Sequence, residues 1–184
     1  MKQLFSNSTN SLISAAVLLA NVYASSGNIE IASDIRIQLH QSDVKKKIGL
    51  SWTVIDEEIY EFRAHDRSHP RSSEIYAELE KISEELIKHG HEYDSSWITR
   101  PLDQDETVAS VLCGHSEKLA IAWNFVVNPT TSRIQITKNL RVCGDCHRAT
   151  KLIAAIRKCE IIVRDANRIH HFYTNGKCSC NDYF

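Results

Sequence analysis

The sequence has few glycines and prolines, no long apolar run and almost no net charge. Its 184 residues include 6 Gly and 3 Pro, too few for a collagen-like chain or a flexible linker. The longest apolar run, Ala15 to Ala20, is far shorter than the roughly 18 residues that span a bilayer. A formal net charge of −1 does not by itself indicate a polyanionic partner. The 42% of hydrophobic and 24% of charged residues are typical of one globular domain, with or without a small appendage.

The charge is unevenly distributed along the chain. Residues 1–106 contain 11 basic and 18 acidic side chains, whereas residues 107–184 contain 11 and 5. An acidic first part and a basic second part predict two different functional surfaces. The basic surface is compatible with a phosphate backbone but does not require one.

Cysteine is missing from the first 112 residues, and all six cysteines lie in the last 72. Four of them form the close pairs Cys143-x-x-Cys146 and Cys178-x-Cys180, and four histidines lie in or beside motifs of the same region: His115, His147, His170 and His171. An even number of cysteines is also compatible with disulfides in a secreted protein. The short Cys/His spacing favours a shared metal, zinc, in a reducing compartment. We interpret Cys113 and Cys159 as small apolar core residues.

The first half of the chain is predicted to be largely helical. Apolar periodicity indicates helices over residues 11–24 and 29–41, joined by a short turn. Such a helical hairpin is typical of one unit of a helical repeat array, although an ordinary antiparallel pair fits the periodicity equally well. Alternation then predicts a short β-hairpin over residues 51–62, and a helix follows from residue 72 to 89. We expect the domain boundary near residue 92: residues 1–92 form a helical extension with the β-hairpin, and residues 93–184 form the second domain.

The second half alternates between helical and strand patterns. We expect a helix over residues 108–123, a strand over 133–137, a helix over 143–158, and strands over 160–164 and 168–173. This order predicts a layered α/β domain.

Two short motifs in this half have the spacing of a known metal site. His115-x-Glu117 and Cys143-x-x-Cys146 are weak signals separately, but together, 28 residues apart, they match the signature of zinc-dependent nucleobase deaminases. Three protein ligands leave the fourth position of a tetrahedral zinc ion open for water. A carboxylate two residues from the histidine can then transfer protons beside the metal without binding it. The general signature has proline before the first cysteine, where this chain has Val142.

Longer motifs resemble the DYW deaminase domain, the C-terminal domain of plant organellar pentatricopeptide-repeat RNA-editing factors. They are Ser51-Trp52, Ser68-His69-Pro70, His115 to Ala120, LRVCGDCH at residues 140–147 and IHHFYTNGKCSCNDYF at residues 169–184. The resemblance covers essentially the whole chain, and residues 1 to about 90 look like the E and E+ segments of that family. Two positions depart from its pattern. The chain ends Asp182-Tyr183-Phe184 rather than Asp-Tyr-Trp, and Ile48-Gly49-Leu50 stands where the family usually has Pro-Gly.

The resemblance implies a cytidine-deaminase-like fold, with a mixed sheet flanked by helices, that hydrolyses cytidine to uridine in chloroplast or mitochondrial RNA. Matched by position, His115, Cys143 and Cys146 would bind the catalytic zinc and Glu117 would be the proton shuttle. The remaining ligands predict a second, closed zinc site formed by His147, His170, Cys178 and Cys180. Two zinc ions are therefore expected per chain. Because alternation along a strand turns only one of two neighbours inward, His171 is the alternative to His170.

The resemblance also indicates partners. Five basic residues that flank the proposed site in sequence are predicted to contact phosphates of single-stranded RNA: Lys118, Lys138, Arg141, Arg148 and Arg168. In the family, an upstream repeat tract chooses the target base. The chain therefore looks like the C-terminal part of a longer organellar precursor, without its transit peptide. Other editing factors are further possible partners, and no membrane partner is expected.

One other function remains open on the sequence, and a second is disfavoured. The chain is alternatively a catalytically inert, zinc-stabilised interaction module of an editing complex, and the Phe184 ending keeps this interpretation open. Glu117 argues against it, because a purely structural metal site needs no acid at that spacing. A thioredoxin-like redox role for Cys143 and Cys146 would leave His115 and Glu117 unexplained.

Overall fold

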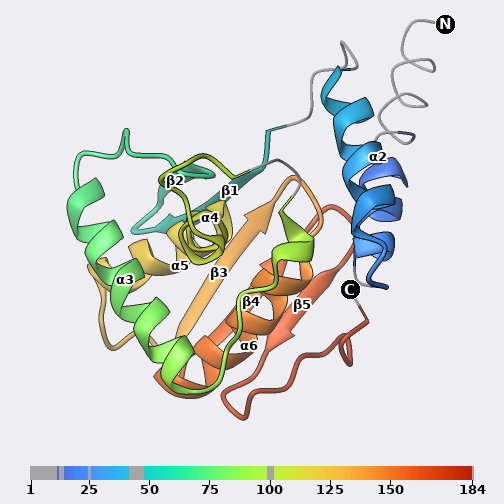
Figure 1. Cartoon of the computed structure of the whole chain (residues 1–184). Helices are drawn as coiled ribbons and strands as arrows, with labels where there is room; N and C mark the ends of the chain where they lie inside the picture. The colour runs from blue at the N-terminus through green and yellow to red at the C-terminus, as the bar shows by residue number, and fades with distance from the viewer. Residues whose placement is uncertain (1–11, 13–14, 25, 42–47, 99–101, 184) are drawn as a thin grey trace, which may run out of the picture. The chain divides into compact units, whose positions relative to one another are not determined.

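The computed structural model describes residues 12, 15–24, 26–41, 48–98 and 102–183. The chain divides into two compact units (Figure 1). The first unit comprises residues 1–47 and 95–104, and the second comprises residues 48–94 and 105–184. The terminal residue Phe184, on which one prediction depended, lies outside the described residues.

The first unit is helical where it is described. Residues 15–24 form one helix and α2 (Ile29–Gln41) the next. The turn between them contains Gly27 at a φ of 83°, a conformation that favours glycine. The Arg36 guanidinium donates hydrogen bonds to Asn21 Oδ1 at 3.3 Å and to Ser96 O at 2.8 Å. Arg36 thus links the first helix to η1 (Ser95–Trp97), a single 3-10 turn.

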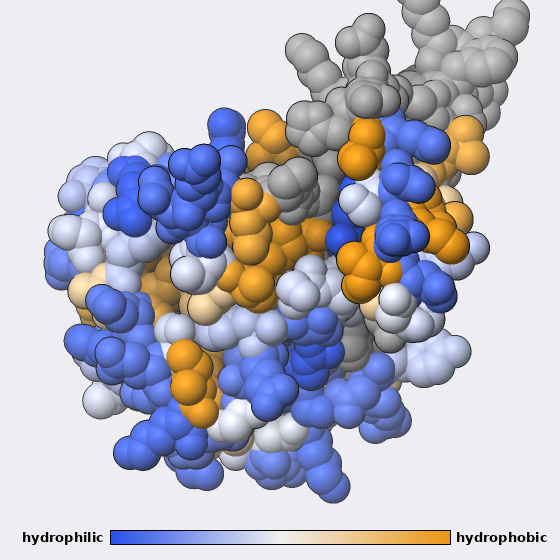
Figure 2. Space-filling model, viewed as in Figure 1, coloured by the Kyte–Doolittle hydropathy of each residue, from blue (hydrophilic) through white to orange (hydrophobic). Residues whose placement is uncertain are grey.

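Apolar side chains on these two helices are exposed, and orange groups mark them in Figure 2. They include Leu18, Leu19, Val22, Ile29, Ile31 and Ile37. The small residues Ala20, Ala24 and Ala32 are buried instead. The helical pair therefore leaves most of its larger apolar side chains uncovered by the described residues.

The second unit is built on a five-stranded sheet with the order β2-β1-β3-β4-β5. Its strands are β1 (Leu50–Ile55), β2 (Glu58–Arg63), β3 (Arg133–Lys138), β4 (Glu160–Arg164) and β5 (Ile169–Phe172). Strands β3 and β4 are parallel and the other neighbouring pairs are antiparallel. The prediction of a mixed sheet is therefore confirmed. Asp56 and Glu57 both have positive φ, as two-residue hairpin turns that match the twist of the strands require.

Four helices accompany the sheet: α3 (Ser72–Lys88), α4 (Val108–Cys113), α5 (Ser116–Val127) and α6 (Gly144–Arg157). Helix α5 packs on β1, β2 and β3, helix α6 packs on β4 and β5, and α3 packs against both helices. The core lies between the sheet and these helices, and the predicted apolar face of α3 is buried in it, at Ile75, Leu79, Ile82 and Leu86. No helix among the described residues is long and apolar enough to cross a membrane.

The β-hairpin belongs to the same sheet as the later strands. Backbone pairing joins Ser51 to Lys138 and Trp52 to Thr137. The expected boundary at residue 92 therefore separates strands that share one sheet, and the division between compact units falls elsewhere. The physical reason is a strand pairing between segments far apart in the sequence, which no local pattern shows. A division of the chain into family segments near residue 92 stays a prediction.

The single helix expected over residues 108–123 is two helices. Helix α4 ends at Gly114, and His115 has an extended backbone, with φ −64° and ψ 143°. The His65 N–H donates to Gly114 O at 2.7 Å, and a Cβ on Gly114 would lie 2.3 Å from His65 Nδ1. A side chain at position 114 would therefore require the His65 ring to move. The break places His115 at the N-cap of α5 and Glu117 in its first turn.

Candidate metal centres and active site

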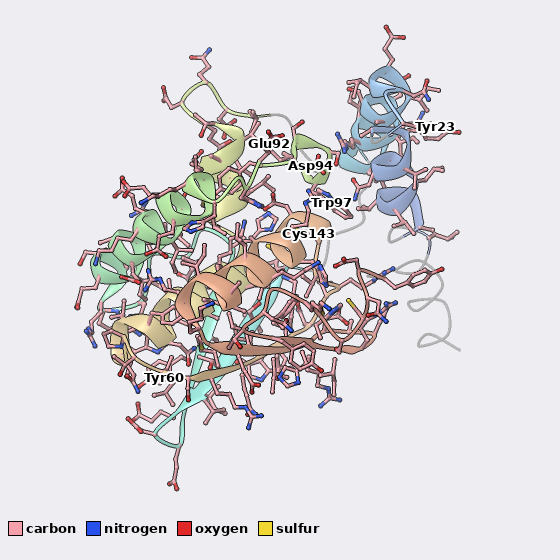
Figure 3. The ribbon with its side chains drawn as sticks, turned by 90° about the horizontal axis from the view of Figure 1, so that it is seen from below. Tyr23, Tyr60, Glu92, Asp94, Trp97 and Cys143 are labelled. Carbon is pink, nitrogen blue, oxygen red and sulfur yellow. The ribbon has the colours of Figure 1, made fainter. Side chains whose placement is uncertain are left out.

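The first group of candidate ligands consists of His115, Cys143 and Cys146. His115 Nδ1 lies 3.3 Å from Cys146 Sγ and 3.6 Å from Cys143 Sγ. A tetrahedral zinc ion with ordinary Zn–S and Zn–N bonds separates its ligand atoms by about 3.5–3.8 Å. Cys143 is the N-cap residue of α6, and its position at the start of that helix is marked in Figure 3. One nitrogen and two sulfur donors therefore fit a zinc ion that keeps a fourth position open.

Valine at position 142 has a structural consequence. The Val142 N–H donates a buried hydrogen bond to Asp165 Oδ2 at 3.1 Å. Proline, the residue of the general signature, has no N–H to donate. The departure therefore adds a contact that fixes the backbone directly before Cys143.

Glu117 is a buried carboxylate, with only 2% of its surface exposed. Lys138 Nζ lies 2.8 Å from its Oε2 atom, and the Ser116 hydroxyl donates to the same oxygen at 3.2 Å. Burial alone would raise the pKa of Glu117, but the charges of Lys138 and His115 outweigh it and lower the pKa to about 2. Glu117 is therefore ionised at neutral pH and able to accept a proton.

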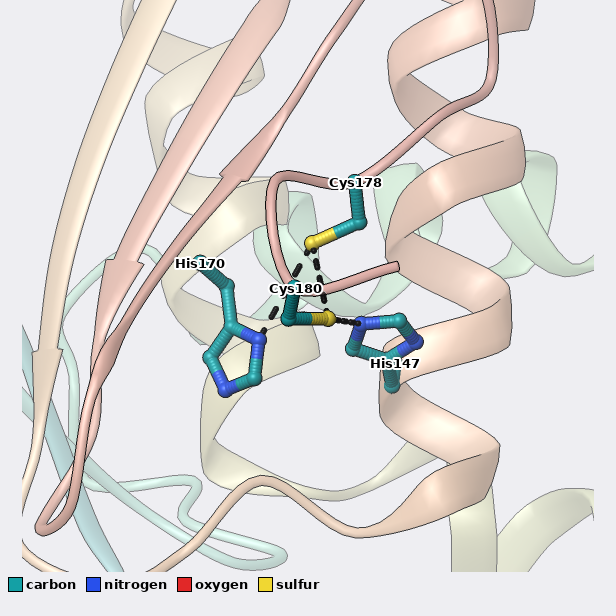
Figure 4. Close-up of side chains that lie close together, drawn as sticks. All are labelled: His147, His170, Cys178 and Cys180. Carbon is teal, nitrogen blue, oxygen red and sulfur yellow. Dashed lines mark hydrogen bonds between the residues drawn. The ribbon is translucent and has the colours of Figure 1, made fainter. Parts of the chain in front are cut away.

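The second group consists of His147, His170, Cys178 and Cys180 (Figure 4). Their ligand atoms all lie within 4.8 Å of one another. His147 Nε2 is 3.0 Å from Cys180 Sγ, and the two sulfur atoms are 3.3 Å apart. Burial lowers the pKa of His147 to about 4, so its ring is neutral near pH 7, the form that binds metals. Two nitrogens and two sulfurs complete a tetrahedron, as in structural zinc sites.

The structure brings His170, rather than His171, into this group. His170 is buried on β5 with Nδ1 3.9 Å from Cys178 Sγ, whereas His171 Nε2 lies 3.5 Å from Glu160 Oε2. The other ring nitrogen of His170, Nε2, is 3.2 Å from Asp165 Oδ2. A carboxylate at that position fixes the ring orientation and leaves Nδ1 free to bind a metal.

Two of the residues predicted to contact RNA lie in positions that do not suit that role. Lys118 is 1% exposed, and its Nζ lies 2.7 Å from the buried carboxylate of Asp145. A buried ammonium in such a pair cannot reach a phosphate in solvent, so the prediction for Lys118 is corrected. Lys138 is 8% exposed and is paired with Glu117 instead.

The three arginines of that set differ in their surroundings. Arg141 is exposed, and no ion pair to it is found among the described residues. Arg148 is paired with Asp94 at 2.9 Å, and Arg168 donates to the Tyr183 carbonyl. Arg141, two residues before Cys143, is thus the best placed of the five for a phosphate contact.

Sequence reasoning missed two buried carboxylates, Asp145 and Asp165. Asp145 lies 3.3 Å from His91 Nε2 and accepts the Asp94 N–H at 3.4 Å, in addition to its pair with Lys118. Burial opposes its ionisation, but His91 and Lys118 lower the pKa of Asp145. Their positions in the sequence could have indicated them. Asp145 lies between the two cysteines of a metal motif, and Asp165 directly follows the strand β4.

Comparison with known proteins matches the part of the chain that contains both groups. Residues 90–184 match the DYW family of nucleic acid deaminases, over a range that contains both groups of ligands. The chain belongs to the DYW family. Residues 59–86 match the E+ motif, which in this DYW-family chain covers most of β2 and α3.

Similar sequences occur in longer plant proteins. The DYW-family chain is 46% identical over 170 residues to Pentatricopeptide repeat-containing protein At2g27610 of Arabidopsis thaliana, covering 92% of this chain and 20% of the relative. It is 43% identical over 168 residues to Pentatricopeptide repeat-containing protein ELI1, chloroplastic, of the same plant, covering 91% of this chain and 26% of the relative. The chain thus spans about a fifth to a quarter of the length of these relatives.

Proposed function

We propose that this DYW-family chain is a zinc-dependent deaminase that converts cytidine to uridine in organellar RNA. The observation that carries the proposal is Glu117, a buried carboxylate that pairs with Lys138 at 2.8 Å and lies two residues from His115. Among the described residues, His115 belongs to a group of three candidate metal ligands. A purely structural site would need a fourth protein ligand and no such acid.

His115, Cys143 and Cys146 would hold the ion. Zinc bound there would activate a water molecule for attack near neutral pH. Glu117 accepts one proton from the attacking water and passes it to the ring nitrogen N3, and it then carries the second proton, from the resulting hydroxyl, to the leaving amine. The C4–N bond of cytosine breaks, ammonia leaves, and the oxygen of water becomes the carbonyl oxygen of uracil.

The second group has a structural role in this proposal. His147, His170, Cys178 and Cys180 would enclose a second zinc ion completely, so no position remains for substrate. Such an ion joins the start of α6 to β5 and to the last residues of the chain. Its binding energy therefore contributes to folding.

The substrate and partners follow from the relatives and from the first unit. The relatives are pentatricopeptide repeat-containing proteins, and some are named chloroplastic. Exposed apolar side chains on the first two helices support stacking against upstream repeats, which would choose the target cytidine. The basic second half supports contact with single-stranded RNA.

The proposal is tested with this chain fused to a repeat tract that binds a known RNA. Sequencing of the RNA after incubation with the folded, zinc-loaded fusion should show uridine at the cytidine placed beside the tract. An RNA with the cytidine moved several positions away is the control. No conversion by a zinc-loaded fusion that binds this RNA would refute the deaminase and favour the inert interaction module.

A further inference from the structure

Three segments of the second unit meet at the Glu117 carboxylate. Ser51 comes from β1, Ser116 from the first turn of α5, and Lys138 from the end of β3. Lys138 Nζ lies 2.8 Å from Glu117 Oε2 and donates to Ser116 Oγ at 3.2 Å. Ser116 in turn donates to the same Oε2 atom at 3.2 Å.

A second hydroxyl supports this contact. Ser51 Oγ lies 2.9 Å from Ser116 Oγ, and it is the donor of that hydrogen bond when the Ser116 proton is directed to Glu117. Ser51 is fully buried, and its backbone pairs with Lys138 in the sheet. The strand register therefore fixes the distance between Ser51 and Lys138, and the network has little freedom to rearrange.

Two of these contacts hold the carboxylate by the same oxygen. Lys138 Nζ approaches Oε2, and the Ser116 hydroxyl donates to Oε2 as well. A buried carboxylate without a partner is costly, and carboxylate oxygen is itself a zinc ligand. Without Lys138, Glu117 would have a reason to turn toward the metal group that includes His115.

We propose that Lys138 is a positioning residue of the deamination reaction, which holds Glu117 by Oε2 so that Oε1 serves proton transfer and the carboxylate does not bind the metal. The inference rests on the proposed function. It gives a role to the Ser51-Trp52 motif as well, since Ser51 contacts the Ser116 hydroxyl, which bonds to both Lys138 and Glu117.

The test compares Lys138→Met and Lys138→Arg in the fusion with a matched repeat tract. Lys138→Met should lower kcat about tenfold to a hundredfold at nearly unchanged KM and with two zinc ions still bound. Arginine, which keeps a cation near Oε2, should restore part of kcat. Lys158→Met, at the opposite end of α6 from Cys143, is the control and should match the wild type.

A spectroscopic readout separates positioning from a structural role. With Co²⁺ in place of zinc, Lys138→Met should change the metal absorption spectrum, and adding Glu117→Gln should reverse that change. If Lys138→Met does not fold, Ser116→Ala should show the same split between kcat and KM to a smaller extent. A folded Lys138→Met variant, or failing that Ser116→Ala, with wild-type kcat and spectrum overturns the inference, whereas an inactive wild-type fusion overturns the proposed function.

Discussion

Cys146 and His147 are consecutive residues of α6, yet their side chains belong to two different groups of candidate metal ligands. Cys146 Sγ lies 3.3 Å from His115 Nδ1, and His147 Nε2 lies 3.0 Å from Cys180 Sγ. Adjacent side chains of a helix point about 100° apart, which allows one turn to supply both groups. A displacement of this turn would therefore alter both centres.

Asp165 connects the two groups a second time. Its Oδ2 atom faces His170 Nε2 at 3.2 Å and accepts the N–H of Val142, the residue before Cys143, at 3.1 Å. Its other oxygen accepts the backbone N–H groups of Asn167 and Arg168. One carboxylate thus holds a ligand of the second group and the backbone next to a ligand of the first.

Replacing a ligand of the second group should remove one metal ion. Cys180→Ser is expected to lower the zinc content from two to one per chain and to lower the melting temperature, because a closed zinc site contributes directly to folding. Metal analysis of the purified protein measures this. Cys159→Ala, which removes a thiol outside both groups, should leave the zinc content at two. If the Cys180→Ser protein still bound two zinc ions, a second site that uses Cys180 as a ligand would be excluded.

Asp165→Asn should weaken both centres at once. The amide cannot accept all of the hydrogen bonds that the carboxylate accepts, so the free energy of unfolding should fall by about 1–3 kcal/mol. Zinc should also be lost to a chelator faster than from the wild type. The exposed Asp105→Asn is the matched control. Equal chelation rates in both variants would show that Asp165 does not support the metal sites.

Lys118→Met should destabilise the protein rather than weaken RNA binding specifically. It leaves the buried Asp145 carboxylate without its lysine partner and with His91 as its remaining ion-pair partner among the described residues, which costs about 3–5 kcal/mol in denaturant unfolding. The double variant Lys118→Met/Asp145→Asn should recover part of this loss, because the uncompensated charge is gone. A folded Lys118→Met of wild-type stability but with reduced RNA affinity would restore the original interpretation of Lys118.

Arg141→Ala should weaken RNA binding at low salt. An exposed arginine near the proposed active site contributes one phosphate contact, so the slope of log affinity against log salt should decrease by about 1. Arg133→Ala, at the opposite end of β3 from Lys138, provides the comparison. The same decrease in both variants would mean that RNA binding is not localised near the active site.

Local patterns predicted those features that depend on neighbouring residues. Apolar spacing located the buried face of α3, and the spacing of Cys143 and Cys146 predicted two ligands at one helix start, because both depend on helical geometry. Alternation along β5 predicted that one of His170 and His171 turns inward.

Features that depend on distant contacts could not be predicted. The pairing of β1 with β3 brings Ser51 to Lys138, and nothing near either residue indicates it. At the break between α4 and α5, Gly114 contacts the distant residue His65, and Lys118 is buried where it pairs with Asp145. Each of these is a tertiary interaction that outweighs a local pattern.

The role of Glu117 is the centre of the proposed mechanism, and conversion of cytidine at fixed zinc occupancy tests it most directly. Glu117→Gln keeps the size of the side chain and removes its ability to accept a proton. In the fusion with a matched repeat tract, this variant should bind two zinc ions and RNA as the wild type does, and its conversion of cytidine to uridine should fall by about 10²-fold or more. Conversion by zinc-loaded Glu117→Gln at close to the wild-type rate would contradict the mechanism.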